Sequence, residues 1–195
     1  GTPTNTDLGT HNVALEVADG KGSTTPQDFT ITVVEDINVP TIITLNPLNN
    51  AIEVTPKNDI KITFSENIVK GTGNIIIYEV TGDQIVETIE VTATNVTITD
   101  ATVTINPSMH LLYNKSYYIQ IATTVFKDIS GNNFVGIEDK TTYTFATESN
   151  MAPTFTSTPI TSVNENTNYA YEINGTDNDN DAFAITAPNK PDWLD

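Results

Sequence analysis

Apolar and polar residues alternate along most of the chain in short runs. A period of two is that of a strand with one buried face. Gly, Asn, Asp and Pro separate the runs, and no segment keeps a helical period beyond about one turn. In the middle of the chain the alternating apolar positions are Ile60, Ile62 and Phe64; Ile75 and Ile77; Val96 and Ile98; Val103 and Ile105; Tyr117, Ile119 and Ile121; Tyr143 and Phe145. The pattern predicts an all-β fold of β-sandwich modules.

The alternation divides the chain into three parts, residues 1–38, 39–148 and 149–195. Only the middle part has enough predicted strands for a complete sandwich. The first part offers two strands around the turn Asp19–Gly22, with Val13, Leu15 and Val17 on one face and Phe29, Ile31 and Val33 on the return strand. Two strands cannot bury a core, so we expect residues 1–38 to end one module and residues 149–195 to begin another. The chain is therefore expected to be a piece of a longer protein.

The middle part resembles the bacterial Ig-like domains of the S-layer and large surface-protein type. The resemblance rests on four segments: Ile60–Glu66, Gly71–Ile77, Phe126–Phe134 and Thr142–Thr147. It implies an Ig-like sandwich that serves as a spacer or binding module in a long extracellular protein. The implied location is the bacterial cell surface.

The two flanks resemble the dystroglycan-type cadherin-like repeat, but in the wrong order. Gly1–Asn5 and Thr10–Gly20 look like its second half. Asn164-Glu165, Thr176–Asp181 and Pro191–Leu194 look like its first half. The resemblance implies tandem Ig-like and cadherin-like β-sandwich modules, with the two halves belonging to different repeats.

The charge balance limits the partners. The chain has 25 acidic residues against 8 basic ones, all of them Lys, and a formal net charge of −17. Nucleic acid recognition needs clustered Lys and Arg, so that class of function is excluded, as is binding to an anionic membrane surface. No run is long and apolar enough to insert directly into a membrane. Repulsion on this scale favours bound divalent cations, although a solvated acidic surface is the other reading.

The acidic run near the C-terminus is the main candidate for chemistry. Asp177, Asp179 and Asp181 occupy alternate positions in a predicted loop. Such carboxylates can converge on Ca²⁺, which takes six to eight oxygen ligands with tolerant geometry. The alternative is a solvated turn, because Asp and Asn favour turns through local hydrogen bonds.

The cadherin-like resemblance implies a fuller set of calcium ligands. It makes Asp177 and Asp179 ligands, with Asp181 as a third. It also implies four further candidates: Glu148 and Asn150 in the linker before the last part, Asp19 in the Asp-x-Gly turn of the preceding repeat, and Glu165 at the far end of its module. Neither linker keeps the full acidic cadherin sequence.

Other conspicuous residues have a structural reading beside the functional one. Asp128 is expected to cap the turn that Gly131 closes with a positive φ, and less readily to bind a cation. Trp193 is expected in a core rather than on a carbohydrate-binding surface. Tyr118 is expected to face outward. His11, placed on the polar face of its strand, and His110, in a loop, are expected at the surface.

No residues suggest catalysis. There is no cysteine, so a catalytic thiol, a disulfide and a cysteine zinc site are excluded. No Ser/His/Asp set or His pair with zinc-like spacing is present. The sequence predicts a non-enzymatic repeat segment of a secreted bacterial adhesin or stalk, with Ca²⁺ at module junctions. Its partners would be neighbouring modules of the same protein, and surface glycans or another cell-surface protein. The alternative is a carbohydrate- or surface-binding accessory region of a secreted multidomain enzyme.

Overall fold

The computed structural model describes residues 1–194 and divides the chain into two compact units, Gly1–Thr147 and Glu148–Asp195. The described residues form strands and two single-turn 3₁₀ helices, η1 (Asn5–Asp7) and η2 (Thr81–Asp83), without an α-helix. The all-β expectation is confirmed. In the described part of the chain, no helix has the length and apolarity needed to cross a membrane.

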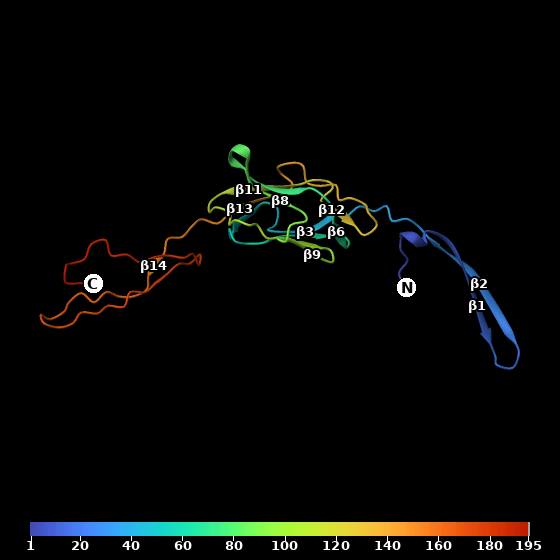
Figure 1. Ribbon diagram of the computed structural model, residues 1–195, viewed down its shortest axis with the longest axis horizontal. Coiled ribbons are helices and arrows are strands. Elements are labelled where there is room, and N and C mark those ends of the chain that lie inside the picture. Colours follow the sequence, from blue (N-terminus) through green and yellow to red (C-terminus); the bar gives the residue numbers. More distant parts are fainter. Residues whose placement is uncertain (195) are drawn as a thin grey trace. The chain divides into compact units, whose positions relative to one another are not determined.

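The middle of the chain is a sandwich of two sheets (Figure 1). The four-stranded sheet has the order β3-β5-β10-β9, with β3 at Ile42–Asn46, β5 at Ile60–Phe64, β10 at Thr102–Ile105 and β9 at Val96–Thr99. The five-stranded sheet has the order β4-β13-β11-β7-β8, with β4 at Ala51–Val54, β13 at Thr144–Thr147, β11 at Ser116–Ile121, β7 at Asn74–Glu79 and β8 at Gln84–Glu90. All their pairings are antiparallel except that of β4 with β13.

A small third sheet closes one end of the sandwich. It pairs β6 (Ile68–Lys70) with β12 (Phe126–Asp128) and sets Asp128 opposite Ile68. Phe126 packs against Phe64 of β5, with ring centroids 5.7 Å apart. The chain between β12 and β13 thus returns over the end of the core and brings the Asp128 turn to this end.

The core consists of the inward-facing residues of the two sheets. Ile60, Ile62 and Phe64 are all buried, and so are Ile75 and Ile77. The alternation in the sequence is therefore the packing pattern of a sandwich. Every buried apolar residue among those described lies between Pro40 and Phe145. The free energy of burial that holds the fold is thus confined to the middle of the chain.

Residues before the sandwich form one long hairpin, β1 (Gly9–Ala18) with β2 (Thr24–Val33). The turn contains Asp19, whose Oδ1 accepts hydrogen bonds from the backbone N–H of Lys21 (2.7 Å) and of Ser23 (3.1 Å). These bonds lower the pKa of the Asp19 carboxyl. The sequence predicted this hairpin, but no residue of it is buried.

The register of the hairpin corrects one expectation. His11 pairs with Ile31 and Val13 pairs with Phe29, so His11 lies on the apolar face rather than on the polar one. His11 shares this face with Val13 because alternate residues of a strand point to the same side. The ring Nε2 of His11 lies 2.6 Å from the backbone oxygen of Asp7, and the residue is exposed, as expected.

The Glu148–Asp195 unit has little regular structure. Its two strands, β14 (Thr154–Phe155) and β15 (Gly175–Thr176), form a ladder of two residue pairs. Asp177 is the one buried residue among those described in this unit. Trp193 was expected in a core, and this is wrong: the residue is 66% exposed, and its ring packs edge-on against Tyr169 at 6.2 Å.

Candidate functional site

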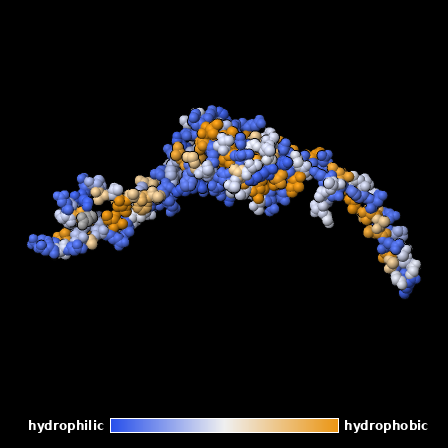
Figure 2. Space-filling view, in the orientation of Figure 1, coloured by the Kyte–Doolittle hydropathy of each residue, from blue (hydrophilic) through white to orange (hydrophobic). Residues whose placement is uncertain are grey.

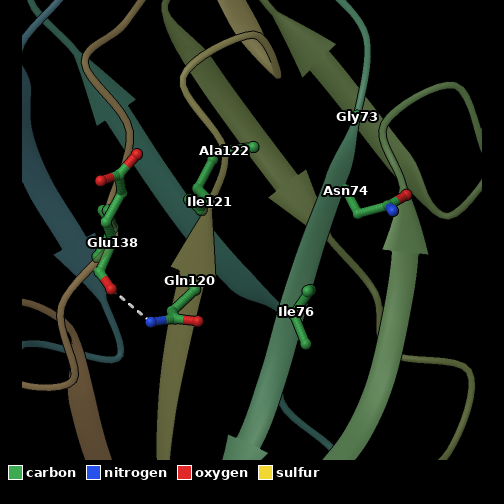
Figure 3. A pocket seen from close by; sticks show the side chains of 8 residues that line it. Gly73, Asn74, Ile76, Gln120, Ile121, Ala122 and Glu138 are labelled. Atoms are coloured by element: carbon green, nitrogen blue, oxygen red, sulfur yellow. Dashed lines mark hydrogen bonds between the residues drawn. The ribbon is translucent and has the colours of Figure 1, made fainter.

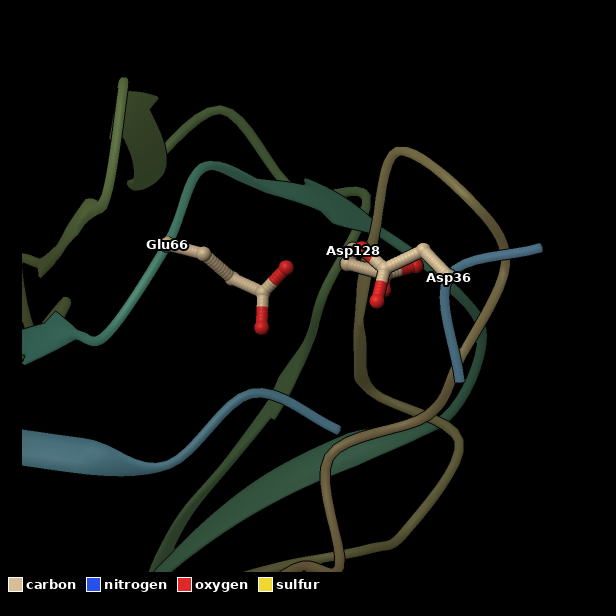
Figure 4. A group of neighbouring side chains, drawn as sticks. All are labelled: Asp36, Glu66 and Asp128. Carbon is tan, nitrogen blue, oxygen red and sulfur yellow. The ribbon is translucent and has the colours of Figure 1, made fainter. Parts of the chain in front are cut away.

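Three carboxylates from distant parts of the sequence meet at the end of the sandwich closed by β6 and β12. Asp36 precedes β3, Glu66 follows β5, and Asp128 ends β12 (Figure 4). One carboxylate oxygen of each lies within 4.8 Å of those of the other two. Asp36 and Glu66 are accessible to solvent, whereas Asp128 is only 2% exposed. Hard oxygen ligands at this spacing are what Ca²⁺ uses.

Asp128 is fixed by its own turn. Its Oδ1 accepts the backbone N–H groups of Gly131 (2.6 Å) and Asn132 (2.7 Å), and its Oδ2 accepts from Asn132 Nδ2 (2.8 Å). Gly131 has φ +103°, the conformation that glycine adopts without strain. The expected capping role of Asp128 is confirmed.

The segment that carries Asp36 is tied to the sandwich by two hydrogen-bonded contacts. Asn132 Nδ2 also donates to the backbone oxygen of Asp36 (2.8 Å). Further along, the N–H of Thr41 donates to Ser65 Oγ (3.1 Å), and the N–H of Ser65 donates to the Thr41 oxygen (2.8 Å). These bonds hold the segment before β3 beside the turns that carry Asp128 and Glu66.

The pKa of Glu66 responds to the negative charges around it. Partial burial and, after it, repulsion from Asp128 and from Asp36 raise the pKa of the Glu66 carboxyl. The charged form of Glu66 is therefore destabilised by its neighbours. A divalent cation placed among the three carboxylates would remove that repulsion.

The residues predicted from the acidic run lie in the second unit and bond mainly to backbone. Asp177 Oδ1 accepts the N–H groups of Asp179 (2.9 Å) and Asp181 (3.2 Å), which is the geometry of an Asx turn. Asp179 Oδ2 accepts the N–H of Met151 (2.5 Å). The acidic run thus contacts the linker at Met151, close in sequence to Glu148 and Asn150.

The remaining predicted ligands lie elsewhere. Glu165 is exposed in a turn where the N–H of Thr167 bonds the Asn164 oxygen (3.3 Å), and Asp19 closes the β1–β2 turn. In residues 1–194, the set with mutually close ligand atoms is that of Asp36, Glu66 and Asp128. Sequence reasoning weighed Asp128 as a ligand but missed Asp36 and Glu66. The three lie 30 and 62 positions apart, with no local motif to link them.

The surface of the sandwich also carries a groove lined by the paired strands β7 and β11 and by Ile137 and Glu138 (Figure 3). Two of the lining residues are joined by a hydrogen bond, in which Gln120 Nε2 donates to the backbone oxygen of Glu138 (2.5 Å). Glu138 is the one titratable side chain among the residues that line it, so the groove offers no acid–base pair.

Tyr118 was expected to face outward into solvent, but its side chain is buried. The residue is 2% exposed, because its ring stacks on Tyr78 at 4.7 Å and its hydroxyl donates to Asp83 (3.1 Å). Lys140 lies over the same ring, with its Nζ 5.8 Å from the centroid. Tyr118 therefore does not present its ring to solvent, as a carbohydrate-stacking residue would.

Two sheets packed face to face, antiparallel except for the edge pair of β4 with β13, define a β-sandwich module. A family model described as the bacterial Ig-like domain matches residues 36–147, and the chain belongs to that family. The match begins at Asp36, so the acidic group lies wholly within it.

The chain was also compared with solved structures and with curated proteins. The chain is similar to a solved structure, the S-layer protein rSbsC(31-844), with 18% identity and a TM-score of 0.38. The similarity covers 61% of this chain and 15% of that one, so this chain spans a small part of that protein. No curated protein matches.

Proposed function

We propose that this chain is a structural segment of a bacterial cell-surface protein, a stalk or adhesin, whose module junctions are stiffened by Ca²⁺. Its membership of a family of non-catalytic Ig-like modules supports the structural role. The observation that carries the calcium part is the meeting of Asp36, from the segment before the sandwich, with Glu66 and Asp128 of the sandwich itself.

The mechanism is mechanical. A cation held by Asp36 on one side and by Glu66 and Asp128 on the other would tie the incoming segment to the sandwich more firmly than the Asn132–Asp36 hydrogen bond does alone. Ligand binding to the folded state then becomes resistance to bending and unfolding. At the second junction the same role falls to Asp177 and Asp179, with Glu148 and Asn150 in the linker they touch.

Calcium titration tests the proposal. At a Ca²⁺ concentration of about 100 times Kd, binding to the folded state adds about 2.7 kcal/mol to the free energy of unfolding. We expect Tm to rise by several degrees in Ca²⁺ relative to chelator, with saturable heat of binding in calorimetry. The whole chain is used, with Mg²⁺ as the comparison ion.

The variant Glu66→Gln distinguishes the effect of bound metal on stability from the effect of charge repulsion. In chelator at neutral pH the variant should match or exceed the parent by up to about 1 kcal/mol, since a repelled charge is removed. In Ca²⁺ it should lose most of the rise in Tm. Glu90→Gln, an exposed position on β8, is the control and should keep the full response.

A double variant tests the second junction. Asp177→Asn and Asp179→Asn together keep the oxygen acceptors of the Asx turn and remove two charges. If the heat of binding survives in a chain that carries all three substitutions, or if the parent shows no heat and no change in Tm, calcium bound at these carboxylates is not what stiffens the chain. The segment would then be a passive spacer.

A further inference from the structure

The turn after β12 contacts the segment that enters the sandwich before β3. Asn132 Nδ2 lies 2.8 Å from the backbone oxygen of Asp36 and 2.8 Å from Asp128 Oδ2. The nitrogen of a primary amide carries two hydrogens, so the Asn132 side chain can donate to both oxygens at once. Figure 4 shows Asp36 beside Asp128, although the two lie far apart in the sequence. One neutral side chain thus joins two of the three residues of the acidic group.

The backbone of Asn132 is fixed independently of its side chain. Its N–H donates to Asp128 Oδ1 (2.7 Å), and its oxygen accepts the N–H of Asp128 (3.0 Å). The N–H of Gly131 donates to the same Oδ1 (2.6 Å). Loss of the Asn132 amide would therefore leave these three bonds of the turn in place. The effect of the amide on the entering segment can thus be separated from the capping of the turn.

The entering segment has local structure of its own. Asp36 Oδ1 accepts hydrogen bonds from the backbone N–H (3.0 Å) and the side-chain Nδ2 (2.8 Å) of Asn38, which closes an Asx turn. At the other end of the segment, Thr41 and Ser65 exchange two hydrogen bonds. The end that carries Asp36 is joined to the sandwich by the amide of Asn132.

The negative charges of the acidic group oppose this arrangement. Partial burial, and after it repulsion from Asp128 and Asp36, raise the pKa of the Glu66 carboxyl. Without a cation, that repulsion favours movement of the Asp36 segment away from the sandwich. A hydrogen bond from a neutral amide to the backbone oxygen of Asp36 acts against this movement and leaves the charge of the group unchanged.

We propose that Asn132 is a positioning residue, which latches the entering segment onto the Asp128 turn and thereby holds Asp36 in the acidic group. The latch itself consists of hydrogen bonds and needs no cation. Its importance for cation binding rests on the proposed function. There, Asn132 would order one of the three calcium ligands before the metal binds, which lowers the entropy lost on binding.

Backbone ¹⁵N relaxation of the whole chain in chelator tests the latch. In the parent, the N–H order parameters of Ile37 and Asn38 should be about 0.8, a value typical of rigid backbone. Asn132→Ala removes both donated hydrogen bonds and should lower these order parameters to below about 0.6. Asn132→Asp keeps the shape of the side chain without its donors and should have the same effect.

The matched control is Asn133→Ala, which removes the exposed amide next along the chain and should leave the segment ordered. A second measurement shows whether the turn survives. The amides of Gly131 and of position 132 should stay protected from hydrogen exchange in all three variants, because Asp128 Oδ1 still accepts their hydrogen bonds.

Calcium titration then tests the positioning of Asp36. It is made in the chain that carries Asp177→Asn and Asp179→Asn, so that binding at the first junction alone is measured. Adding Asn132→Ala should raise the Kd for Ca²⁺ by about 10- to 100-fold, the usual effect of removing a group that orients a metal ligand. Adding Asn133→Ala should leave the Kd unchanged.

The proposal is overturned if Ile37 and Asn38 stay as ordered in both Asn132 variants as in the parent, or if Asn133→Ala loosens them equally. It is also overturned if Asn132→Ala loosens the segment without changing the Kd for Ca²⁺. A parent that binds no Ca²⁺ would contradict the proposed function instead. The order parameters in chelator would still decide whether Asn132 latches the segment.

Discussion

At the scale of single residues, Asp128 is at once a turn cap and a member of the acidic group. Its buried carboxylate accepts hydrogen bonds from two backbone N–H groups and from the side-chain amide of Asn132. Asp128 is thus the fixed point of the group, and Asp36 and Glu66 are placed around it. A cation would add to a geometry that the turn already imposes.

Asp128→Ala should lower the free energy of unfolding by about 2–3 kcal/mol, because it leaves the N–H groups of Gly131 and Asn132 without their acceptor. Asp128→Asn keeps one acceptor oxygen and removes the charge. It should cost less than half as much in chelator and still weaken the response to Ca²⁺. Urea unfolding of both variants checks this. Equal losses in the two would show that charge, rather than turn capping, is what the position supplies.

At the scale of elements, the end of the sandwich depends on a close approach of two backbones. Gly71, between β6 and β7, donates its N–H to the Val125 oxygen (2.8 Å), and Thr72 donates to Thr124 (2.8 Å). A Cβ at position 71 would fall well inside contact distance of the Thr124 carbonyl oxygen. The β6–β12 closure and the Asp128 turn after it thus require glycine here for its lack of a side chain.

Gly71→Ala should destabilise the chain by about 1–3 kcal/mol, since backbone must move to make room. Gly82→Ala is the matched comparison. Gly82 has φ +76°, but the nearest atom to its Cβ would be 3.7 Å away, so only the left-handed conformation is penalised, by about 1 kcal/mol. Thermal melts of the two variants provide the test. A loss at Gly71 no larger than that at Gly82 would contradict the close approach.

At the scale of the whole molecule, the middle of the chain contains the buried core, whereas the apolar residues of the flanks are exposed (Figure 2). All buried apolar residues among those described lie between Pro40 and Phe145, inside the matched family region. The flanks carry apolar faces with nothing in this chain's core to cover them. The sandwich and the segments on either side of it therefore differ in the apolar area that they bury.

A chain shortened to residues 36–147 should keep the Tm and the free energy of unfolding of the full chain to within about 1 kcal/mol. The segments removed contribute no buried apolar residue, and the Asn5–Ser130 bond that is lost is exposed. The shortened chain retains Asp36, so its response to Ca²⁺ at the first junction should also persist. A loss above about 2 kcal/mol would show that the hairpin supports the sandwich.

Some of the architecture follows from sequence alone. The period of two at Ile60–Phe64, Ile75–Ile77 and Tyr117–Ile121 predicts strands and their buried faces, because strand geometry makes side-chain direction a local property. The hairpin around Asp19 and the Asp128 turn follow in the same way, since their signals are contiguous. Strands with weaker alternation, such as β3 and β8, were not predicted.

The long-range features could not be read from the chain. Trp193 was expected in a core but is exposed, because burial depends on which other segments pack against a residue. The meeting of Asp36, Glu66 and Asp128 was also invisible, because no local spacing relates them. The sequence by itself determined the all-β class, the faces of the strands and the turn chemistry, all set by neighbours within a few residues. Only the tertiary structure decided which carboxylates share one site and which apolar faces stay uncovered, because those depend on contacts between segments far apart in the chain.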